Sequence, residues 1–401
     1  MSPVGAMLPF VCLLLSIATA GLLVKRFGAP RSLGRFESID GLRGYLALAV
    51  FISHTSVWYY YLRTGRWEDP PSRLYVHFAQ SSVALFFMIT GFLFCSKLLD
   101  DTRRPIDWTR LYVSRLLRLF PLYLFVVVVM FAIVTYLSDG ELKVSRPRLL
   151  YSCFHWVIFS ILGGPDINGV KDTATIVAGV TWSLSYEWFF YASLPVLGLP
   201  LLVPAPKRYL VLSIIGIAGF LMLRPFPMRL LAFVGGIAAS VLVRNAALCN
   251  LAKKPTASFI VMGCLCLTLS LFPTAYAPLP VLLLSVAFVI VACGNTLFGA
   301  LTNSCSRMLG DVSYSIYLLH GILLFSVFRL LIGADRAAAL STMEHCAVAM
   351  LCAPVLILVS FVTYRMIELP GMRRVPRLEA WLHTHLPWVL ASQDAHSYHR
   401  P

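Results

Sequence analysis

Long apolar stretches fill most of this 401-residue chain and constrain its fold more than any other feature. An α-helix needs about 20 consecutive apolar residues to cross the core of a bilayer. The stretches that approach this length cover residues 5–24, 41–62, 117–137, 209–223, 256–272, 280–298, 313–331 and 346–366. The chain is 59% hydrophobic and only 13% charged, whereas soluble domains are about 25% charged. The sequence therefore predicts an all-α, polytopic integral membrane helix bundle.

Positive charge is spread over the short loops between the apolar stretches. The net charge is +15, yet Lys and Arg form no single stripe of the kind that binds nucleic acid. Short cytoplasmic loops of membrane proteins carry an excess of Lys and Arg. We therefore interpret the charge as a sign of topology and predict no nucleic-acid partner.

The segment at 149–162 decides the topology, because it is apolar but short for a span. If it crosses, the basic loops at 207–208 and 244–254 lie outside and the charge asymmetry is lost. We favour a re-entrant or interfacial piece on the outer face, which leaves 138–180 as a long outer segment. The basic segments that then lie inside are 97–118, 207–208, 244–254, 307 and 365–377. This arrangement gives about ten core spans with cytoplasmic core termini.

The first 35 residues are predicted to form an extra unit. Ala18-Thr19-Ala20 resembles a signal-peptidase site behind an apolar run. No basic segment precedes the run, however, and Lys25 and Arg26 follow it, which favours an uncleaved span with an outer N-terminus. We therefore expect an extra span and basic linker at 1–35, a membrane domain at 36–370 and a cytoplasmic tail at 371–401.

Two amphipathic segments are expected to lie on the inner surface as interfacial helices. Residues 108–118 alternate Leu with Arg, and residues 375–389 mix Arg377, Trp381 and Trp388 with Leu.

The cysteines predict no metal site. The ten Cys include no CxxC pair and no His/Cys spacing typical of a metal site, so neither a metal nor a bound cofactor is expected. Seven of them fall within predicted spans: Cys12, Cys95, Cys264, Cys266, Cys293, Cys346 and Cys352.

A few ionisable residues stand where a membrane excludes charge. Each costs about 2.5–3.5 kcal/mol near the bilayer centre, so those that remain are candidates for function. They are Arg43, His54, Glu187, His320 and Arg329. Arg329 is close to an outer end, where its side chain can reach the interface.

Arg43, His54 and Glu187 are the candidate catalytic residues. Arg43 and His54 share one helix face, about three turns or ~16 Å apart. Glu187 reaches a similar depth to His54, so its carboxylate would fix the tautomer of the imidazole and leave one ring nitrogen to accept a proton. Structural roles remain open for all three, since Arg43 could snorkel while His54 and Glu187 join helices by hydrogen bonds.

Two polar, aromatic surfaces are candidate substrate-binding sites. The first holds Trp182, Ser185 and Tyr186, and the second holds Tyr314, Tyr317 and His320. Such surfaces bind sugars by stacking and hydroxyl hydrogen bonds, although they also pack helices together. His320 fits a structural histidine as well as a site residue.

Arg110, Arg115 and Arg118 precede a span on its cytoplasmic side. Arginine forks suit phosphate oxygens, so these residues are candidates for binding a phosphorylated cosubstrate. Anchoring by the positive-inside rule explains the same residues.

Four segments in order complete the motif evidence. They are Ser38-Ile39-Asp40-Gly41-Leu42-Arg43-Gly44 ending in His54, Leu85-Phe86-Phe87-Met88-Ile89-Thr90-Gly91-Phe92, Trp182-Ser183-Leu184-Ser185-Tyr186-Glu187, and Leu309-Gly310-Asp311-Val312-Ser313-Tyr314-Ser315-Ile316-Tyr317. In order and spacing, over residues 36–370, they resemble the acyltransferase 3 family of membrane acyltransferases.

The resemblance implies about ten spans, acetyl-CoA or a related thioester as cosubstrate, and an acceptor hydroxyl on a surface polysaccharide, lipid-linked glycan or similar molecule. The family's Arg-x10-His element falls on Arg43 and His54, and its Arg-x-x-Arg element on Arg115 and Arg118. The acidic residue of its Trp-Ser-Leu-Ser motif falls on Glu187. Many members have a second acidic residue next to it, where this chain has Trp188.

The resulting hypothesis is an O-acetyltransferase of the bacterial cytoplasmic membrane. Coenzyme A docks on Arg115 and Arg118, its pantetheine arm passes Arg43, and His54 acts as a base or a transient acyl acceptor. Ser185 or Tyr314 lies near the oxyanion. The competing class is a transporter or flippase of a glycan or anionic solute, which would suit a buried Arg/His/Glu set; a scaffold that presents a glycan is a third. The sequence leaves the oligomeric state open.

Overall fold

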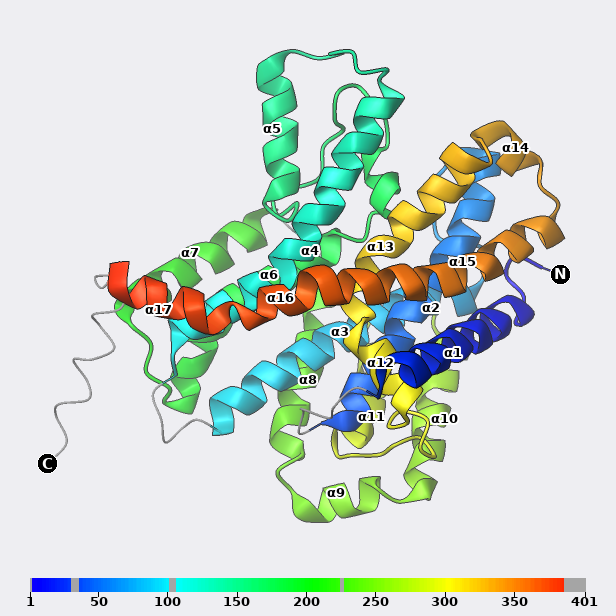
Figure 1. Cartoon of the computed structure of the whole chain (residues 1–401). Coiled ribbons are helices and arrows are strands. Elements are labelled where there is room, and N and C mark those ends of the chain that lie inside the picture. The colour runs from blue at the N-terminus through cyan, green and yellow to red at the C-terminus, as the bar shows by residue number, and fades with distance from the viewer. Residues whose placement is uncertain (1, 30–35, 101–105, 224–226, 386–401) are drawn as a thin grey trace, which may run out of the picture.

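Every regular element that the computed structural model describes is helical, as Figure 1 shows. The described residues are 2–29, 36–100, 106–223 and 227–385, and within them the predicted all-α class is confirmed. The expected linker at 30–35 and the tail at 386–401, which includes Trp388, lie outside the described residues.

The longer helices form one bundle. They are α1 (Met7–Phe27), α2 (Glu37–Thr64), α3 (Arg73–Asp100), α4 (Trp108–Leu137), α6 (Trp182–Gly198), α7 (Lys207–Leu223), α8 (Leu231–Leu242), α10 (Pro255–Leu271), α11 (Pro278–Ala292), α13 (Ser313–Phe325) and α15 (Thr342–Thr363).

Shorter pieces connect them. They are α5 (Arg146–Val157), η1 (Thr173–Val177), η2 (Leu199–Leu201), η3 (Pro227–Leu230), α9 (Ala246–Ala252), α12 (Ser304–Asp311), η4 (Ser326–Leu331), α14 (Ala334–Ala339), η5 (Tyr364–Glu368), α16 (Leu369–Arg373) and α17 (Val375–His385). In Figure 1, α5 and the end of α4 project from the top of the bundle, and α9 lies at the bottom.

Length and hydropathy identify several of these helices as membrane spans. Within the described residues, five helices are long and apolar enough, and a sixth is added if the pair on either side of a 110° bend, Met228–Leu242 and Ala246–Ala252, counts as one span. Pro255–Leu271 and Pro278–Ala292 are shorter apolar helices. The protein is therefore an integral membrane helix bundle, and the number of about ten core spans plus one remains a prediction.

Two of the predicted segments differ from the structure. Residues 108–118 are not a separate interfacial helix but the first turns of α4, since Asp107 caps that helix by accepting from the Arg110 amide at 2.8 Å and Pro121 lies inside it without ending it. The expected span at 280–298 ends at Ala292 in α11. Leu297 and Phe298 have positive φ, a backbone conformation that lies outside the right-handed helical region.

Residues 149–157 of the segment at 149–162 belong to a short helix, α5. Its 12 residues measure about 18 Å at 1.5 Å each, too short for the ~30 Å core of a bilayer. Phe159 and Ser160 then take positive φ, so the chain leaves the helical path. This geometry agrees with an outer segment that does not cross.

Helix α2 is central to the bundle and packs against α3, α12 and α13. Its contact with α12 is unusually close, because a Cβ on Gly310 would lie 2.0 Å from the Asp40 carbonyl oxygen. Only glycine allows such an approach. The contact fixes the N-terminal half of α2, which carries Arg43.

Candidate active site

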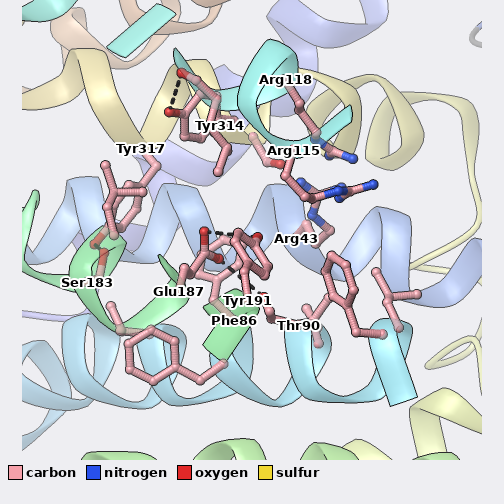
Figure 2. Close-up of a pocket in the computed structure, with 18 residues that line it drawn as sticks. Arg43, Phe86, Thr90, Arg115, Arg118, Ser183, Glu187, Tyr191, Tyr314 and Tyr317 are labelled. Atoms are coloured by element: carbon pink, nitrogen blue, oxygen red, sulfur yellow. Dashed lines mark hydrogen bonds between the residues drawn. The ribbon is translucent and has the colours of Figure 1, made fainter. Parts of the chain in front are cut away.

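A cavity lies among α2, α3, α4, α6 and α13 (Figure 2). Of the predicted site residues, Arg43, Arg115, Arg118, Glu187, Tyr314 and Tyr317 line it. Figure 2 shows the three arginines gathered at one end, Tyr317 and Ser183 at the other, and Glu187 between them. The fold thus brings together residues that are up to 274 positions apart in the chain.

Three guanidinium groups make the arginine end strongly positive. Arg115 and Arg118 are three residues apart on α4 and therefore share a helix face, and Arg43 approaches from α2. The Arg115 guanidinium lies 5.0 Å from the Phe94 ring centroid. Its Nε is buried, and no hydrogen bond in the described part of the chain uses it. This donor is suited to a ligand oxygen.

Arg110 stands apart from this cluster. It is exposed, and its Nε lies 3.6 Å from a carboxylate oxygen of Glu379 in α17. It is not among the residues that line the cavity. The structure therefore separates Arg110 from its two predicted partners.

The Glu187 carboxylate contacts residues of the arginine cavity and not the His54 imidazole. The Thr90 hydroxyl donates to Oε1 at 3.2 Å, and the Tyr191 hydroxyl donates to Oε2 at 3.5 Å. The expected hydrogen bond between Glu187 and His54 is not found among the described residues. Depth along two helices was a poor guide, because it says nothing of the direction in which each side chain points.

The partner of His54 is His320. Nδ1 of His54 lies 2.9 Å from the Val50 carbonyl oxygen and 3.3 Å from Nε2 of His320. Nδ1 of His320 in turn lies 3.2 Å from the carbonyl of Ile316. A carbonyl only accepts, so we assign the proton to Nδ1 in both rings. In this assignment His320 accepts from His54, and Nε2 of His54 has the lone pair.

Aromatic and main-chain groups enclose the His54 ring. Trp67 stacks on it with centroids 6.1 Å apart, and the main chain of Ala178, just after η1, approaches it. Residues 67 and 178 both belong to segments predicted to lie outside. His54 therefore stands between the helix bundle and the outer segments.

Tyr317 connects the cavity with the histidine pair. Its ring lines the cavity, and its centroid lies 6.1 Å from that of His320. The Tyr317 hydroxyl donates to the Val180 carbonyl at 3.2 Å and is 2.8 Å from the Ser183 hydroxyl. The Tyr317 side chain thus lies between the cavity and His320, which contacts His54.

The other predicted substrate residues have different surroundings. The Tyr314 hydroxyl donates to the Leu119 carbonyl at 2.9 Å. The Ser185 hydroxyl donates to the Ser160 carbonyl at 3.2 Å. Trp182 and Tyr186 surround the Arg229 guanidinium, with ring centroids 4.3 and 5.7 Å from it. Ser185, Trp182 and Tyr186 do not line the cavity.

Glu368 is a buried charge that the sequence did not indicate. It is 2% exposed, and its carboxylate accepts from the hydroxyl of Ser315, next to Tyr314 on α13. It lies in the π-helical turn η5, a geometry frequent at functional sites. The predicted last span ended at 366, which placed Glu368 in a loop. The apolar run that defined this span ends just before Glu368, so hydropathy alone does not indicate the carboxyl group.

Comparisons with known proteins agree on a family. A family model described as an acyltransferase domain matches residues 36–365. The acyltransferase MdmB of Streptomyces mycarofaciens is 24% identical over 395 residues, covering 87% of this chain and 94% of that protein. Nodulation protein 10 of Rhizobium leguminosarum bv. viciae is 32% identical over 181 residues, covering 41% and 45%. No solved structure matches. Since the family model covers most of the chain, this protein belongs to the acyltransferase 3 family and is a membrane acyltransferase.

Proposed function

We propose that the protein moves an acetyl group from cytoplasmic acetyl-CoA to a hydroxyl of a surface polysaccharide, lipid-linked glycan or similar acceptor. The observation that carries the proposal is the cavity itself. It begins at Arg43, Arg115 and Arg118 and ends at Tyr317, one side chain from the His320–His54 pair. A cluster of cations at one end and an imidazole beyond the other suit a donor with phosphates at one end and a thioester at the other.

The arginine end is proposed to bind the phosphates of coenzyme A. Guanidinium forks match phosphate oxygens in geometry and charge. Nε of Arg115 makes no hydrogen bond within the described residues, so binding a phosphate would break none there. Arg118 shares the same helix face, and Arg43 lies next along the cavity. The pantetheine arm then follows the cavity toward Tyr317, which has to move aside for the thioester to reach His54.

His54 is proposed to act through Nε2. In one route, Nε2 takes the proton of the acceptor hydroxyl as its oxygen attacks the thioester carbonyl carbon. The carbon–sulfur bond breaks, and the proton passes to the leaving thiolate of coenzyme A. In the other route, Nε2 attacks the thioester carbonyl carbon first and the thiolate of coenzyme A leaves; the hydroxyl oxygen then attacks the acetyl carbon, the bond to Nε2 breaks, and the hydroxyl proton goes to the thiolate. Both routes need the same tautomer, and the Val50 carbonyl and His320 favour it.

The acceptor is proposed to approach from the outer segments. Trp67 lies against His54, and Trp182, Tyr186 and Tyr276 surround Arg229 within 5.7 Å. Aromatic faces beside polar groups suit sugar rings. In this arrangement the donor and acceptor meet at His54 from opposite sides of a bacterial cytoplasmic membrane, with the core termini inside.

Replacement of His54 tests the proposal. Membranes with equal amounts of parent or His54→Ala protein are given radiolabelled acetyl-CoA, and ester-linked label is measured in their saccharide and lipid fractions. We expect His54→Ala to lower transfer by about 10²-fold or more, the usual contribution of a general base. The matched control is His345→Gln. His345 is another buried histidine, bonded to the Thr55 carbonyl at 2.9 Å, and this variant should retain transfer. Retention of more than about a tenth of activity by His54→Ala would remove the role.

A further inference from the structure

Two cysteine thiols meet at the predicted inner face. Cys249 lies in α9, and Cys293 follows the last residue of α11. The structure thus places Cys293 at a helix end and not within a span as expected. The two sulfurs are 2.9 Å apart although 44 residues separate them in the chain. This gap exceeds the ~2.05 Å of a disulfide by about 0.9 Å, so a small side-chain movement would join them.

The pair lines a cavity of about 440 Å³ that is distinct from the arginine cavity. Cys249 is half-buried, and Cys293 is 5% exposed. A small molecule in the cavity can therefore reach Cys249 first. Lys253 lines the same cavity, and the thiolate is the form of a cysteine that reacts with peroxide.

The surroundings of the pair connect it to α2. Glu37 and Ser38, at the start of α2, line the same cavity. The chain after Cys293 continues to Ala300, whose carbonyl accepts from the Tyr45 hydroxyl at 3.2 Å. A bond between Cys249 and Cys293 would thus tie α9 to the segment that supports the N-terminal half of α2.

The side of the membrane predicted for α9 determines the redox conditions at the two thiols. Arg244, Lys253 and Lys254 assign α9 to the cytoplasmic side by the positive-inside rule. Thiols there are normally reduced, and disulfides that do form are transient and respond to oxidants. An adjacent pair of thiols, one reachable and one behind it, has the arrangement of such a site.

We propose that Cys249 and Cys293 are a reversible oxidation site. The Cys249 thiolate attacks one oxygen of hydrogen peroxide, breaks the O–O bond and becomes a sulfenic acid, while the released hydroxide takes a proton to form water. The Cys293 sulfur then attacks the Cys249 sulfur, forms the disulfide and releases a second water. In sum, two thiols and one peroxide give one disulfide and two waters, and a small dithiol reverses the step by exchange.

Peptide mass spectrometry of the full-length protein tests this site. Membranes are treated with hydrogen peroxide, remaining thiols are alkylated, and the digested protein is searched for linked peptides. We expect a linkage between Cys249 and Cys293, a loss of two alkylatable thiols out of ten, and full recovery after a dithiol reductant. Cys305→Ser is the matched control, because Cys305 is also half-buried on the inner side but packs near Gly21 of α1.

The three Cys→Ser variants have different expected results. Cys305→Ser should lose the same two thiols, whereas Cys249→Ser and Cys293→Ser should form no linked peptide. The proposal is overturned if Cys249 and Cys293 both stay alkylatable in the parent, or if peroxide links other cysteines instead. The test reads covalent state alone, so it does not depend on the acyl transfer proposed above.

Discussion

At the residue scale, Arg43, Arg115 and Arg118 line the arginine cavity together with Glu187. The carboxyl groups of Asp40 and Glu368 also interact with Arg43 and Arg118, but they do not line the cavity. An anionic donor in the cavity would compete with Glu187 for the guanidinium groups. We therefore propose that Glu187 affects donor affinity, besides holding α6 to α3 through Thr90.

We predict that Glu187→Gln lowers the KM for acetyl-CoA and keeps kcat within about tenfold of the parent. The amide removes the competing charge, while one oxygen can still accept from Thr90. Steady-state rates at varied acetyl-CoA would measure both constants. A loss of kcat as large as that of His54→Ala would instead show that the carboxylate acts on the imidazole, as in catalytic triads, where the wrong tautomer costs ~10⁴.

Arg115→Ala and Arg118→Ala should raise the KM for acetyl-CoA more than they lower kcat. Phosphate contacts far from the reacting carbonyl bind ground state and transition state alike. Lysine at either position should restore part of the loss, since it lacks the fork. Arg110→Ala is the control, because Arg110 faces Glu379 outside the cavity. An unchanged KM in both cavity variants would identify these arginines as topological anchors only.

The sequence indicated residues that line one cavity but not how they pair. Arg43 and Glu187 were found because charge in a span is costly, and Arg115 and Arg118 because arginines before a span suit phosphate oxygens; all four line the cavity. The His54–His320 contact was not foreseen, because it joins α2 and α13 across 266 positions. No periodicity along one helix contains that information. Arg229 was missed for the same reason, since its aromatic neighbours come from other elements.

At the element scale, α3 and α8 approach each other closely. A Cβ on Gly236 of α8 would lie 2.0 Å from the Met88 carbonyl oxygen of α3. Small residues at such contacts let membrane helices gain van der Waals packing. Because α3 also carries Thr90 and Phe94 of the cavity, this contact supports the site from behind.

Gly236→Ala should therefore destabilise the protein by about 1–3 kcal/mol, the usual cost of overpacking. The measurement is thermal unfolding of detergent-purified protein. Gly263→Ala on α10 is the control, as a Cβ there meets no atom within 4 Å and alanine favours a helix. Equal unfolding temperatures for Gly236→Ala and the parent would mean that the α3–α8 contact relaxes freely.

Helix ends were harder to predict than helix interiors. Apolar length located the interiors of α4 and α11 but not their ends. The start of α4 depends on a cap by Asp107, and α11 ends just before Gly294, whose positive φ is the conformation that glycine allows after a helix. Local hydrogen bonds decide these positions.

At the scale of the whole molecule, the extra N-terminal helix belongs to the same bundle. α1 packs against α12, α15 and α2, and all three of these helices also contact α13, which carries Tyr317 and His320. The hydrophobic pattern predicted this helix as a span, but it could not say that the helix joins the domain. Contacts between distant segments are set by side-chain shape.

The proposal as a whole requires that the acetyl group of coenzyme A, supplied at the inner face, is transferred at His54. Sealed membrane vesicles of both orientations, prepared with the parent or His54→Ala protein, are given radiolabelled acetyl-CoA, which does not cross a bilayer. We expect ester-linked label in inverted vesicles of the parent, none in right-side-out vesicles until they are permeabilised, none with His54→Ala, and no effect of a protonophore. Equal labelling of intact vesicles in both orientations, or labelling that disappears with the protonophore as coupled transport would require, contradicts the proposal.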